Sequence, residues 1–183
     1  MIDSGKENEK LVLTPSQREA LNRLKTFVEG GQEKVFILTG YAGTGKTTLM
    51  RKFIKWLSEH KYSFTLLAST GRAAKVLSNK AGGKAMTIHS CIYTFTAFSQ
   101  DIEKLVHQIE AEKGADSTGQ LLLQFAALKV VNVDNCQKVY IVDEASMVSD
   151  VRDKNPTQAV FGTGKVLTDL LNYDLQGRYI FVG

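Results

Sequence analysis

The chain has 183 residues, of which 43% are hydrophobic, and it carries 23 Lys and Arg against 19 Asp and Glu. This length suits one domain, and this hydrophobic content is enough to bury a core, which excludes wholesale disorder. No apolar run approaches the roughly 18 residues of a membrane helix, and the polar start lacks a secretory signal, so a cytoplasmic protein with no membrane partner is predicted. Two cysteines without paired spacing exclude a disulfide scaffold and a thiolate metal site.

The positive charge is concentrated in the first half of the chain. Residues 1–90 carry 15 basic and 7 acidic side chains, a net charge of +8, whereas residues 91–183 have a net charge of −4. Nearly all of the excess lies between residues 46 and 84, where nine basic residues accompany one acid. A polyanion-binding site needs such a stretch, although a solvated helix face has the same composition.

The first predicted elements are a helix and a strand. Residues 1–10 show no apolar period and are predicted to be a disordered tail, which leaves one core domain over residues 11–183. Thr14 is a good N-cap and Gln17 completes a capping box, so a helix is predicted to begin here and to end at glycines 30 and 31. Residues 34–39 form an apolar, β-branched run, which indicates a strand covered on both faces of a parallel sheet.

Strands and helices alternate through the rest of the chain. The further predicted segments are, in order, a glycine-rich turn at 40–45, the amphipathic helix that follows it, a strand at 63–68, helices at 72–78 and 101–111, a polar loop at 110–119, a strand or helix at 121–133, a strand at 138–142, a helix at 163–172 and a strand at 178–182. This order predicts an α/β fold in which right-handed crossovers join a mostly parallel sheet with helices on both faces.

The strongest functional pattern is the segment GYAGTGKT at residues 40–47, a complete GxxxxGK[ST] phosphate loop between a buried strand and an amphipathic helix. Its glycines let backbone N–H groups point at phosphate oxygens, and the helix N-terminus adds its positive dipole. Lys46 is expected to reach the β- and γ-phosphates, and the Thr47 hydroxyl to help hold Mg²⁺. A structural glycine turn is the alternative. The expected ATP-binding residues are Gly40, Gly43, Thr44, Gly45, Lys46, Thr47 and Thr48.

A second glycine-rich segment, GTGK at residues 162–165, resembles the end of such a loop. It has Ala159 and Val166 where the pattern needs glycine and a hydroxyl side chain, and no buried strand is expected before it. We therefore predict a turn that leads into a helix.

An apolar strand at residues 139–142 ends in two adjacent carboxylates, Asp143 and Glu144. In a P-loop ATPase the first carboxylate completes the Mg²⁺ shell, and the second can act as general base on the attacking water. A solvated pair of acids is the alternative, but a complete phosphate loop in the same chain favours the functional interpretation. The expected catalytic residues are thus Lys46 and Glu144, and the expected Mg²⁺ ligands are Thr47 and Asp143.

Residues 143–147, DEASM, together with the phosphate loop resemble superfamily 1 DNA helicases, in the group of the exonuclease V alpha subunit (RecD) and the phage Dda helicase. The resemblance covers about residues 11–183 and implies the first RecA-like core domain, a P-loop NTPase fold. Gln17, within LTPSQ, matches the family's adenine-reading glutamine. Segments 69–74 and 87–89 match motifs that grip single-stranded DNA, which implies DNA contacts for Thr70, Gly71, Arg72, Thr87 and His89.

These minor motifs also have structural interpretations. Gln17 already serves as the capping-box partner of Thr14, and His89 near apolar residues fits a packed, neutral imidazole. Three aromatic residues could stack on bases, but aromatics beside an apolar segment are more often part of a core. These three are Tyr93, Phe95 and Phe98.

The resemblance implies a motor domain that couples ATP turnover to movement on single-stranded DNA. Residues 180–183 match the strand that precedes the family's next motif, so a second RecA-like domain is expected to be missing from this chain. In the family that domain supplies an arginine to the transition state, and the chain alone is therefore expected to bind ATP·Mg²⁺ but hydrolyse it weakly. The alternatives are a nucleotide or small-molecule kinase and a nucleotide-gated binding module.

Overall fold

The computed structural model describes residues 12–30, 32–81, 83–98, 123–130, 137–152 and 159–183. Its centre is a five-stranded, fully parallel sheet in the order β1-β8-β6-β2-β3. The strands are β1 (Val35–Leu38), β2 (Phe64–Ala68), β3 (Ala85–Thr87), β6 (Val139–Asp143) and β8 (Arg178–Val182). The predicted α/β fold and the four predicted strands of this sheet are confirmed, whereas the three-residue β3 was not predicted.

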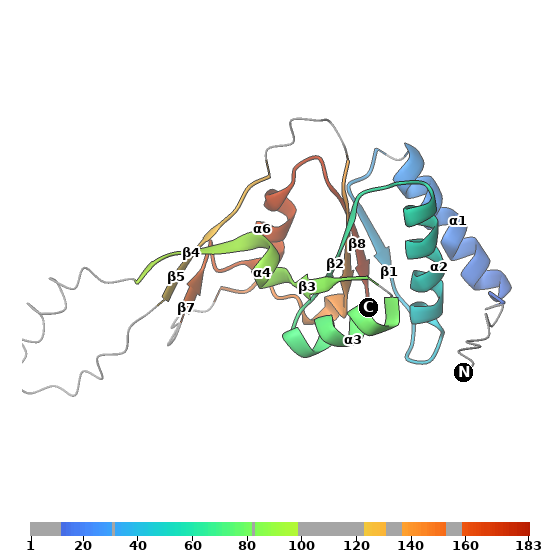
Figure 1. The fold of residues 1–183 in the computed structure, drawn as a ribbon, viewed down its shortest axis with the longest axis horizontal. Helices are drawn as coiled ribbons and strands as arrows, with labels where there is room; N and C mark the ends of the chain where they lie inside the picture. Colours follow the sequence, from blue (N-terminus) through green and yellow to red (C-terminus); the bar gives the residue numbers. More distant parts are fainter. Residues whose placement is uncertain (1–11, 31, 82, 99–122, 131–136, 153–158) are drawn as a thin grey trace, which may run out of the picture.

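Helices cover both faces of the sheet (Figure 1). The helices α1 (Pro15–Gly30), α2 (Lys46–Glu59) and α3 (Gly71–Ala81) pack on one face, and α4 (Ile88–Ile92) and α6 (Val166–Tyr173) on the other. Because successive side chains of a strand point to opposite faces, β6 sends Val139 and Ile141 into the first layer and Tyr140 and Val142 into the second. Two apolar cores therefore sandwich the sheet, as parallel strands require.

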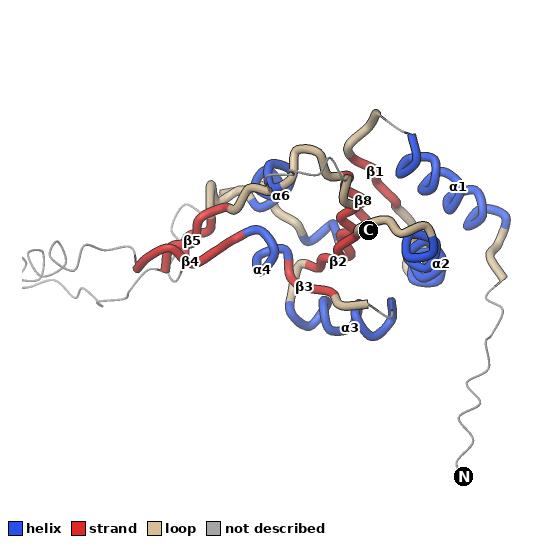
Figure 2. Tube along the Cα trace, turned by 45° about the horizontal axis from the view of Figure 1, so that its top comes forward, coloured by secondary structure: helices blue, strands red, loops and turns tan. Residues whose placement is uncertain are grey.

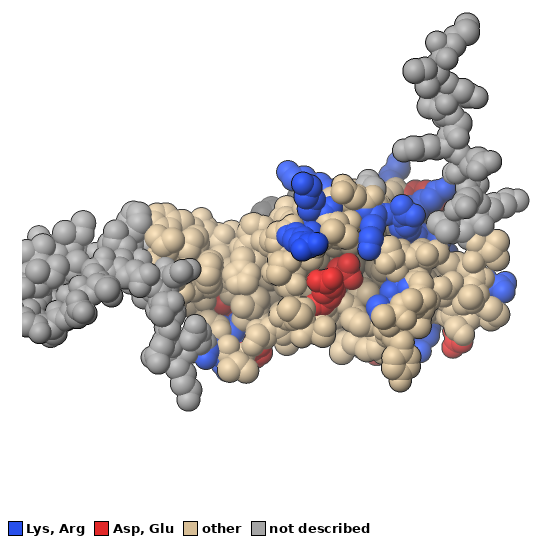
Figure 3. Space-filling model, turned by 90° about the horizontal axis from the view of Figure 1, so that it is seen from below, with Lys and Arg blue, Asp and Glu red and all other residues tan. Residues whose placement is uncertain are grey.

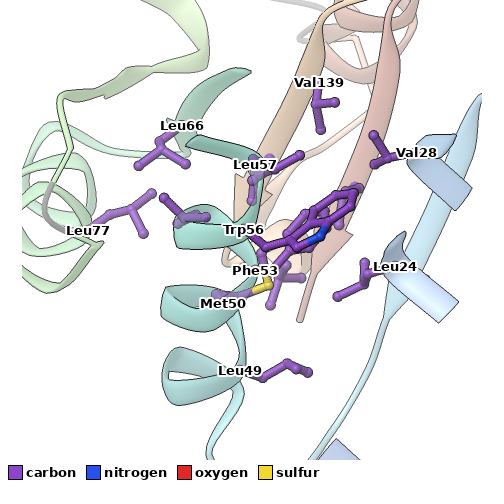
Figure 4. Packing of buried hydrophobic residues seen from close by; sticks show 14 of the residues in the cluster. Leu24, Val28, Leu49, Met50, Phe53, Trp56, Leu57, Leu66, Leu77 and Val139 are labelled. Atoms are coloured by element: carbon purple, nitrogen blue, oxygen red, sulfur yellow. The ribbon is translucent and has the colours of Figure 1, made fainter. Parts of the chain in front are cut away.

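The larger core lies under α2 (Figure 4). Trp56 lies at its centre, and its ring stacks on that of Phe53 with centroids 6.0 Å apart. Leu24 and Val28 of α1 close one side and Leu77 of α3 the other. This packing holds α2, and with it the loop that precedes α2, against the sheet.

Strand β1 departs from the prediction, because it is covered on one face only. It is the edge strand of the described sheet, and Val35 and Ile37 are 38% and 68% exposed. The buried residues of the second layer come from β2, β6 and β8 together with α4, β4 and α6, and none comes from β1. The prediction of a strand covered on both faces was therefore wrong for β1, since α4 and α6 lie over the middle of the sheet.

A second, smaller sheet was not predicted as a unit. It has the order β4-β5-β7, with β4 antiparallel to β5 and β5 parallel to β7, and it extends away from the main sheet in Figures 1 and 2. Its strands are β4 (Tyr93–Phe98), β5 (Leu123–Ala127) and β7 (Ala159–Phe161). The strand alternative for residues 121–133 is confirmed where β5 lies. The predicted tail at 1–10, helix at 101–111 and loop at 110–119 fall outside the described residues.

The helix predictions hold with shifted ends. Helix α1 has the expected bounds, α3 continues three residues beyond the predicted 72–78, and α6 begins at Val166 instead of residue 163. Within the described part of the chain, no helix is long and apolar enough to cross a membrane.

Candidate nucleotide and nucleic-acid site

The carboxyl ends of all five parallel strands meet at one edge of the sheet. The register pairs Leu38 with Val182, and it pairs Ala68 with both Asp143 and Thr87. The loops that leave these strands therefore lie side by side, and they include the phosphate loop, the acid pair and both predicted DNA segments. Open α/β sheets bind their ligands at this edge.

The phosphate loop has the backbone that its glycines predict. Gly43 and Gly45 have φ angles of +82° and +80°, in the left-handed region, and α2 begins directly afterwards at Lys46. The Lys46 amine donates hydrogen bonds to the carbonyl oxygens of Gly40 and, at 3.2 Å, Tyr41. The loop is also tied to β8, since Gly40 N donates to Gly183 O at 3.1 Å. The lysine amine and the N-terminus of α2 thus face the same loop.

The backbone turns sharply between the two carboxylate residues at the end of β6. Asp143 is the last residue of the strand, whereas Glu144 turns into the left-handed region with φ +52° and ψ +44°. The Glu144 N–H donates to Asp143 Oδ1 at 3.1 Å, which fixes the first carboxylate at the strand end. A non-glycine residue is uncommon in this conformation, which costs about 1–3 kcal/mol of backbone strain. Residues strained in this way cluster at functional sites.

A pocket of about 390 Å³ brings the predicted catalytic groups together, and Lys46, Asp143 and Glu144 line it. A smaller pocket, of about 30 Å³, shares Lys46 and Asp143 with it and is also lined by Thr47. A hydroxyl and a carboxylate are hard oxygen donors, which fits Mg²⁺, an ion that proteins hold through one or two side chains together with phosphates. Among the described residues, no group of three or more His, Cys, Asp or Glu forms a metal site on its own.

The pocket also contains residues that the sequence did not single out as ligands. Ser146 and Met147, in the short turn after the acid pair, and Gly183 at the end of β8 line the same space. The sequence did contain a signal for these residues, since 145–147 belong to the DEASM segment and Gly183 follows a predicted buried strand. The sequence did not predict the strand order, which places β8 between β1 and β6 and so brings Gly183 to the pocket.

Gln17 forms the predicted capping box and one contact that was not predicted. Thr14 N donates to Gln17 Oε1 at 3.0 Å, and Gln17 N donates to Thr14 Oγ1 at 3.2 Å. In addition, Gln17 Nε2 donates to the carbonyl oxygen of Thr44 at 3.0 Å. The side chain therefore joins the start of α1 to the phosphate loop, and its expected contact with adenine stays a prediction.

The two predicted DNA segments, residues 69–74 and 87–89, lie next to each other at the carboxyl ends of β2 and β3. Their threonine hydroxyls, however, have structural roles. Thr70 Oγ1 accepts from Ala73 N at 3.2 Å at the start of α3, and Thr87 Oγ1 accepts from Ser90 N at 3.0 Å as N-cap of α4. Gly71 and Arg72 are exposed in the first turn of α3. Both threonine oxygens accept hydrogen bonds here, and the Thr87 O–H donates to Ser90 Oγ at 2.9 Å. Backbone groups, Arg72 and the O–H of Thr70 are therefore the available contacts for a phosphodiester backbone.

His89 is a packed imidazole, as the structural alternative for it stated. Its ring meets Phe161 edge-on with centroids 4.8 Å apart and lies 5.5 Å from the ring of Tyr93. Burial lowers the pKa of His89 below its ordinary value of 6.5, which favours the neutral form. A DNA contact by His89 stays a prediction, and its burial disfavours a contact through the charged imidazolium.

The aromatic candidates for base stacking behave differently from one another. Tyr93 is 6% exposed and its hydroxyl donates to Asp169 Oδ2 at 2.8 Å, so the stacking hypothesis was wrong for it. Phe95 is 48% exposed and meets Phe125 edge-on at 5.7 Å. The side chain of Phe98 lies outside the described part.

The GTGK segment at residues 162–165 is a turn that leads into a helix, as predicted. Gly162 and Gly164 have positive φ, and α6 starts at Val166, but a short, partly buried strand, β7, does precede the turn. The carboxylate of Asp169 accepts hydrogen bonds from both Thr163 N and Thr163 Oγ1. Asp169 is 3% exposed, so an internal carboxylate takes the donors that a phosphate would need.

A basic surface lies beside the ligand edge. We give this name to the side chains on and after α2 and α3: Arg51, Lys52, Lys55, Arg72, Lys75, Lys80 and Lys84. Figure 3 views the molecule from the α3 end and shows Lys and Arg gathered next to a small acidic group. Among the described residues the structure records one ion pair, Lys55 with Glu59 at 3.7 Å, so most of this positive charge is not neutralised within the domain.

The packing of His89 leads to a pH dependence of stability. Because the His89 pKa is lowered in the folded state, the unfolded chain takes up the proton first, and the free energy of unfolding falls as pH drops below about 6.5. His89→Gln is expected to reduce this slope between pH 7.5 and 5.5 in urea unfolding. His60→Gln, at the end of α2, is the matched control and should keep it. Equal slopes in both variants would contradict the burial of a neutral imidazole.

The parallel sheet, the glycine loop at its carboxyl edge and the acid pair beside it define a P-loop NTPase. A model of the AAA domain family matches residues 12–167, more than half of the chain, and the chain belongs to this family.

Two sequence relatives and one solved structure are similar to parts of this chain. The chain is 40% identical over 81 residues to the ATP-dependent DNA helicase dda of Enterobacteria phage T4, covering 44% of this chain and 18% of the helicase. It is 25% identical over 133 residues to the replication restart protein PriA of Bacillus subtilis (strain 168), covering 70% of this chain and 16% of PriA. The crystal structure of Pif1 helicase from Candida albicans aligns with a TM-score of 0.40 and 18% identity, covering 93% of this chain and 40% of that one. The matched segments span less than a fifth of either sequence relative.

Proposed function

We propose that this chain is an ATP-binding and ATP-hydrolysing motor domain of a DNA helicase of the RecD/Dda-like group, which couples ATP turnover to movement on single-stranded DNA. One observation carries the proposal: the phosphate loop, the acid pair and the β2 and β3 loops lie along one sheet edge in strand order. Similarity to a phage helicase and to a replication restart protein supports it.

In the proposed mechanism, the backbone of the phosphate loop and Lys46 hold the phosphates of ATP. Thr47 and Asp143 would hold Mg²⁺, which would neutralise charge that develops on the phosphates. Glu144, which lines the same pocket as Lys46, orients the attacking water and accepts its proton. In this proposal the backbone turn at residue 144 lets Asp143 serve as Mg²⁺ ligand and Glu144 as general base.

We expect the chain alone to turn over ATP slowly. Phosphoryl-transfer enzymes gain orders of magnitude from an arginine that meets the transition-state charge. Among the described residues, no arginine lines the pocket that contains both Lys46 and Glu144, and Arg51 of the smaller neighbouring pocket donates to the carbonyl oxygen of Lys80. In the proposed motor this group comes from a second RecA-like domain, as it does in the family that the sequence resembles.

On the DNA side, the proposed path runs over the exposed first turn of α3. Arg72 is the charged side chain there, and the basic surface continues behind it along α3 and α2. Phosphate contacts of this kind dominate affinity and weaken with salt, because each contact releases counterions.

The test is salt-dependent binding of a fluorescent single-stranded oligonucleotide. Arg72→Gln should weaken binding at low salt and reduce the slope of log K against log salt concentration by about 0.7, the value for one lost single-strand contact. Lys34→Gln is the matched control, because Lys34 is an exposed base at the opposite edge of the sheet, before β1. If wild type does not bind, or both variants match it, the proposed DNA path is wrong.

A further inference from the structure

We propose that Gln17 is a positioning residue for the phosphate loop, so that its loss weakens binding of any triphosphate whatever its base. This inference rests on the proposed nucleotide function of the loop and adds to it. The two ends of one amide make two different contacts: Oε1 accepts from Thr14 N, and Nε2 donates to Thr44 O, each at 3.0 Å. Residues 17 and 44 are 27 positions apart, so this contact joins two elements.

The capping box sets the orientation of the amide. The Gln17 N–H is held by the Thr14 hydroxyl at 3.2 Å, and the Thr14 N–H is held by Gln17 Oε1. Because the side-chain oxygen is committed to the cap, the donor nitrogen has to face the other way, toward the loop. The start of α1, whose buried residues pack in the larger core, thus becomes a fixed support for the loop.

The hydrogen bond from Gln17 Nε2 to Thr44 O fixes the direction of the Gly45 N–H. A trans peptide is planar, with its C=O and N–H on opposite sides, so a hydrogen bond to Thr44 O from outside turns the Gly45 N–H the other way. That N–H belongs to the residue that caps α2 in the left-handed conformation, with φ +80°. In a phosphate loop such amides are the groups that bind phosphate oxygens.

Close packing shows how tightly the amide fits. A Cβ at position 45 would collide with Gln17 Nε2, so the amide lies directly against this glycine. From inside the loop, Thr44 Oγ1 donates to Tyr41 O at 2.8 Å and Thr44 N donates to the same oxygen at 3.3 Å. Residue 44 is thus held from within by the loop and from outside by α1.

Reading an adenine edge would need the same amide oxygen and nitrogen. Base contact and loop support are therefore alternative uses of one side chain, and they predict different specificities. A residue that only reads the base matters for ATP alone. A residue that positions the loop matters equally for ATP, GTP and a ligand without a base.

The experiment measures binding of ATP, GTP and inorganic tripolyphosphate, each with Mg²⁺, by calorimetry. Gln17→Ala should weaken all three by a similar factor of roughly 2 to 12, the range for one lost hydrogen bond. Gln17→Glu keeps an oxygen for Thr14 N but has no donor for Thr44 O, and it should bind no better than Gln17→Ala. Thr14→Ala is the control, because it removes the Thr14 hydroxyl from the capping box but keeps the backbone Thr14 N–H on Gln17 Oε1 and so leaves Gln17 Nε2 on Thr44 O, and its affinities should stay within twofold of wild type.

The outcomes separate this inference from the proposed function. If wild type binds all three ligands and Gln17→Ala weakens ATP only, Gln17 reads the base and the inference is wrong. Equal losses in Gln17→Ala and Thr14→Ala would also overturn it, since they would show an effect of helix capping alone. A wild type that binds none of the three overturns the proposed function as well.

Discussion

Lys46→Ala is expected to abolish the stabilisation of this domain by ATP·Mg²⁺. Wild type at a nucleotide concentration of 100 times its Kd should gain about 2.7 kcal/mol, which raises the melting temperature of a chain of this size by roughly 5–11 °C. The amine of Lys46 is the cation at the phosphate loop and lines both pockets beside Asp143. Without the Lys46 amine, the negative charge of the β- and γ-phosphates has no positive partner at the loop. The increase in melting temperature with ATP·Mg²⁺ should therefore fall close to zero.

The control for this experiment, Lys55, lies about two and a half turns further along the same helix. Lys55 is exposed, pairs only with Glu59 on the helix surface, and lines neither pocket beside the loop, so Lys55→Ala removes the same charge from α2 without touching the loop. Its nucleotide-dependent shift should equal that of wild type. A Lys46→Ala protein that still melts several degrees higher with ATP·Mg²⁺ would show that the nucleotide binds elsewhere.

The parts of the site that the sequence predicted are those carried by local patterns. The phosphate loop needs glycines and a lysine within eight residues, and the acid pair follows an apolar strand directly. Both patterns specify backbone conformation and chemistry together, and the structure has positive φ at Gly43 and Gly45 and a turn at Glu144. The capping box of α1 is equally local, and its two hydrogen bonds are present.

The features that the sequence did not predict depend on distant segments. The hydrogen bond of Gln17 to Thr44 crosses 27 residues, and the contact of His89 with Phe161 crosses more than 70. The strands β3 and β7 have three residues each, too few to show a period. The exposure of Ile37 follows from the position of β1 at the sheet edge, which an apolar run of residues does not encode.

Glu144→Gln is expected to separate binding from hydrolysis. The amide has nearly the shape of the carboxylate but cannot accept a proton, so the rate of ATP cleavage should fall by about 10²- to 10⁴-fold, the usual contribution of a general base. Affinity for ATP·Mg²⁺ should be retained, since Lys46, Thr47 and Asp143 are unchanged. Single-turnover cleavage of labelled ATP by excess protein is the suitable measurement, because it detects slow rates.

The matched control is Glu19→Gln on the exposed side of α1, which removes the same charge away from the pocket and should cleave ATP at the wild-type rate. Because the backbone at 144 has φ +52°, glutamine keeps the same local conformational cost as glutamate, and a loss of rate reports on the carboxylate itself. If Glu144→Gln cleaves ATP as fast as wild type, the general base is another group. The backbone N–H of residue 144, which donates to Asp143 Oδ1, is the same in both proteins, so a fall in affinity instead of rate would mean that the Glu144 carboxylate itself contributes to binding of ATP·Mg²⁺.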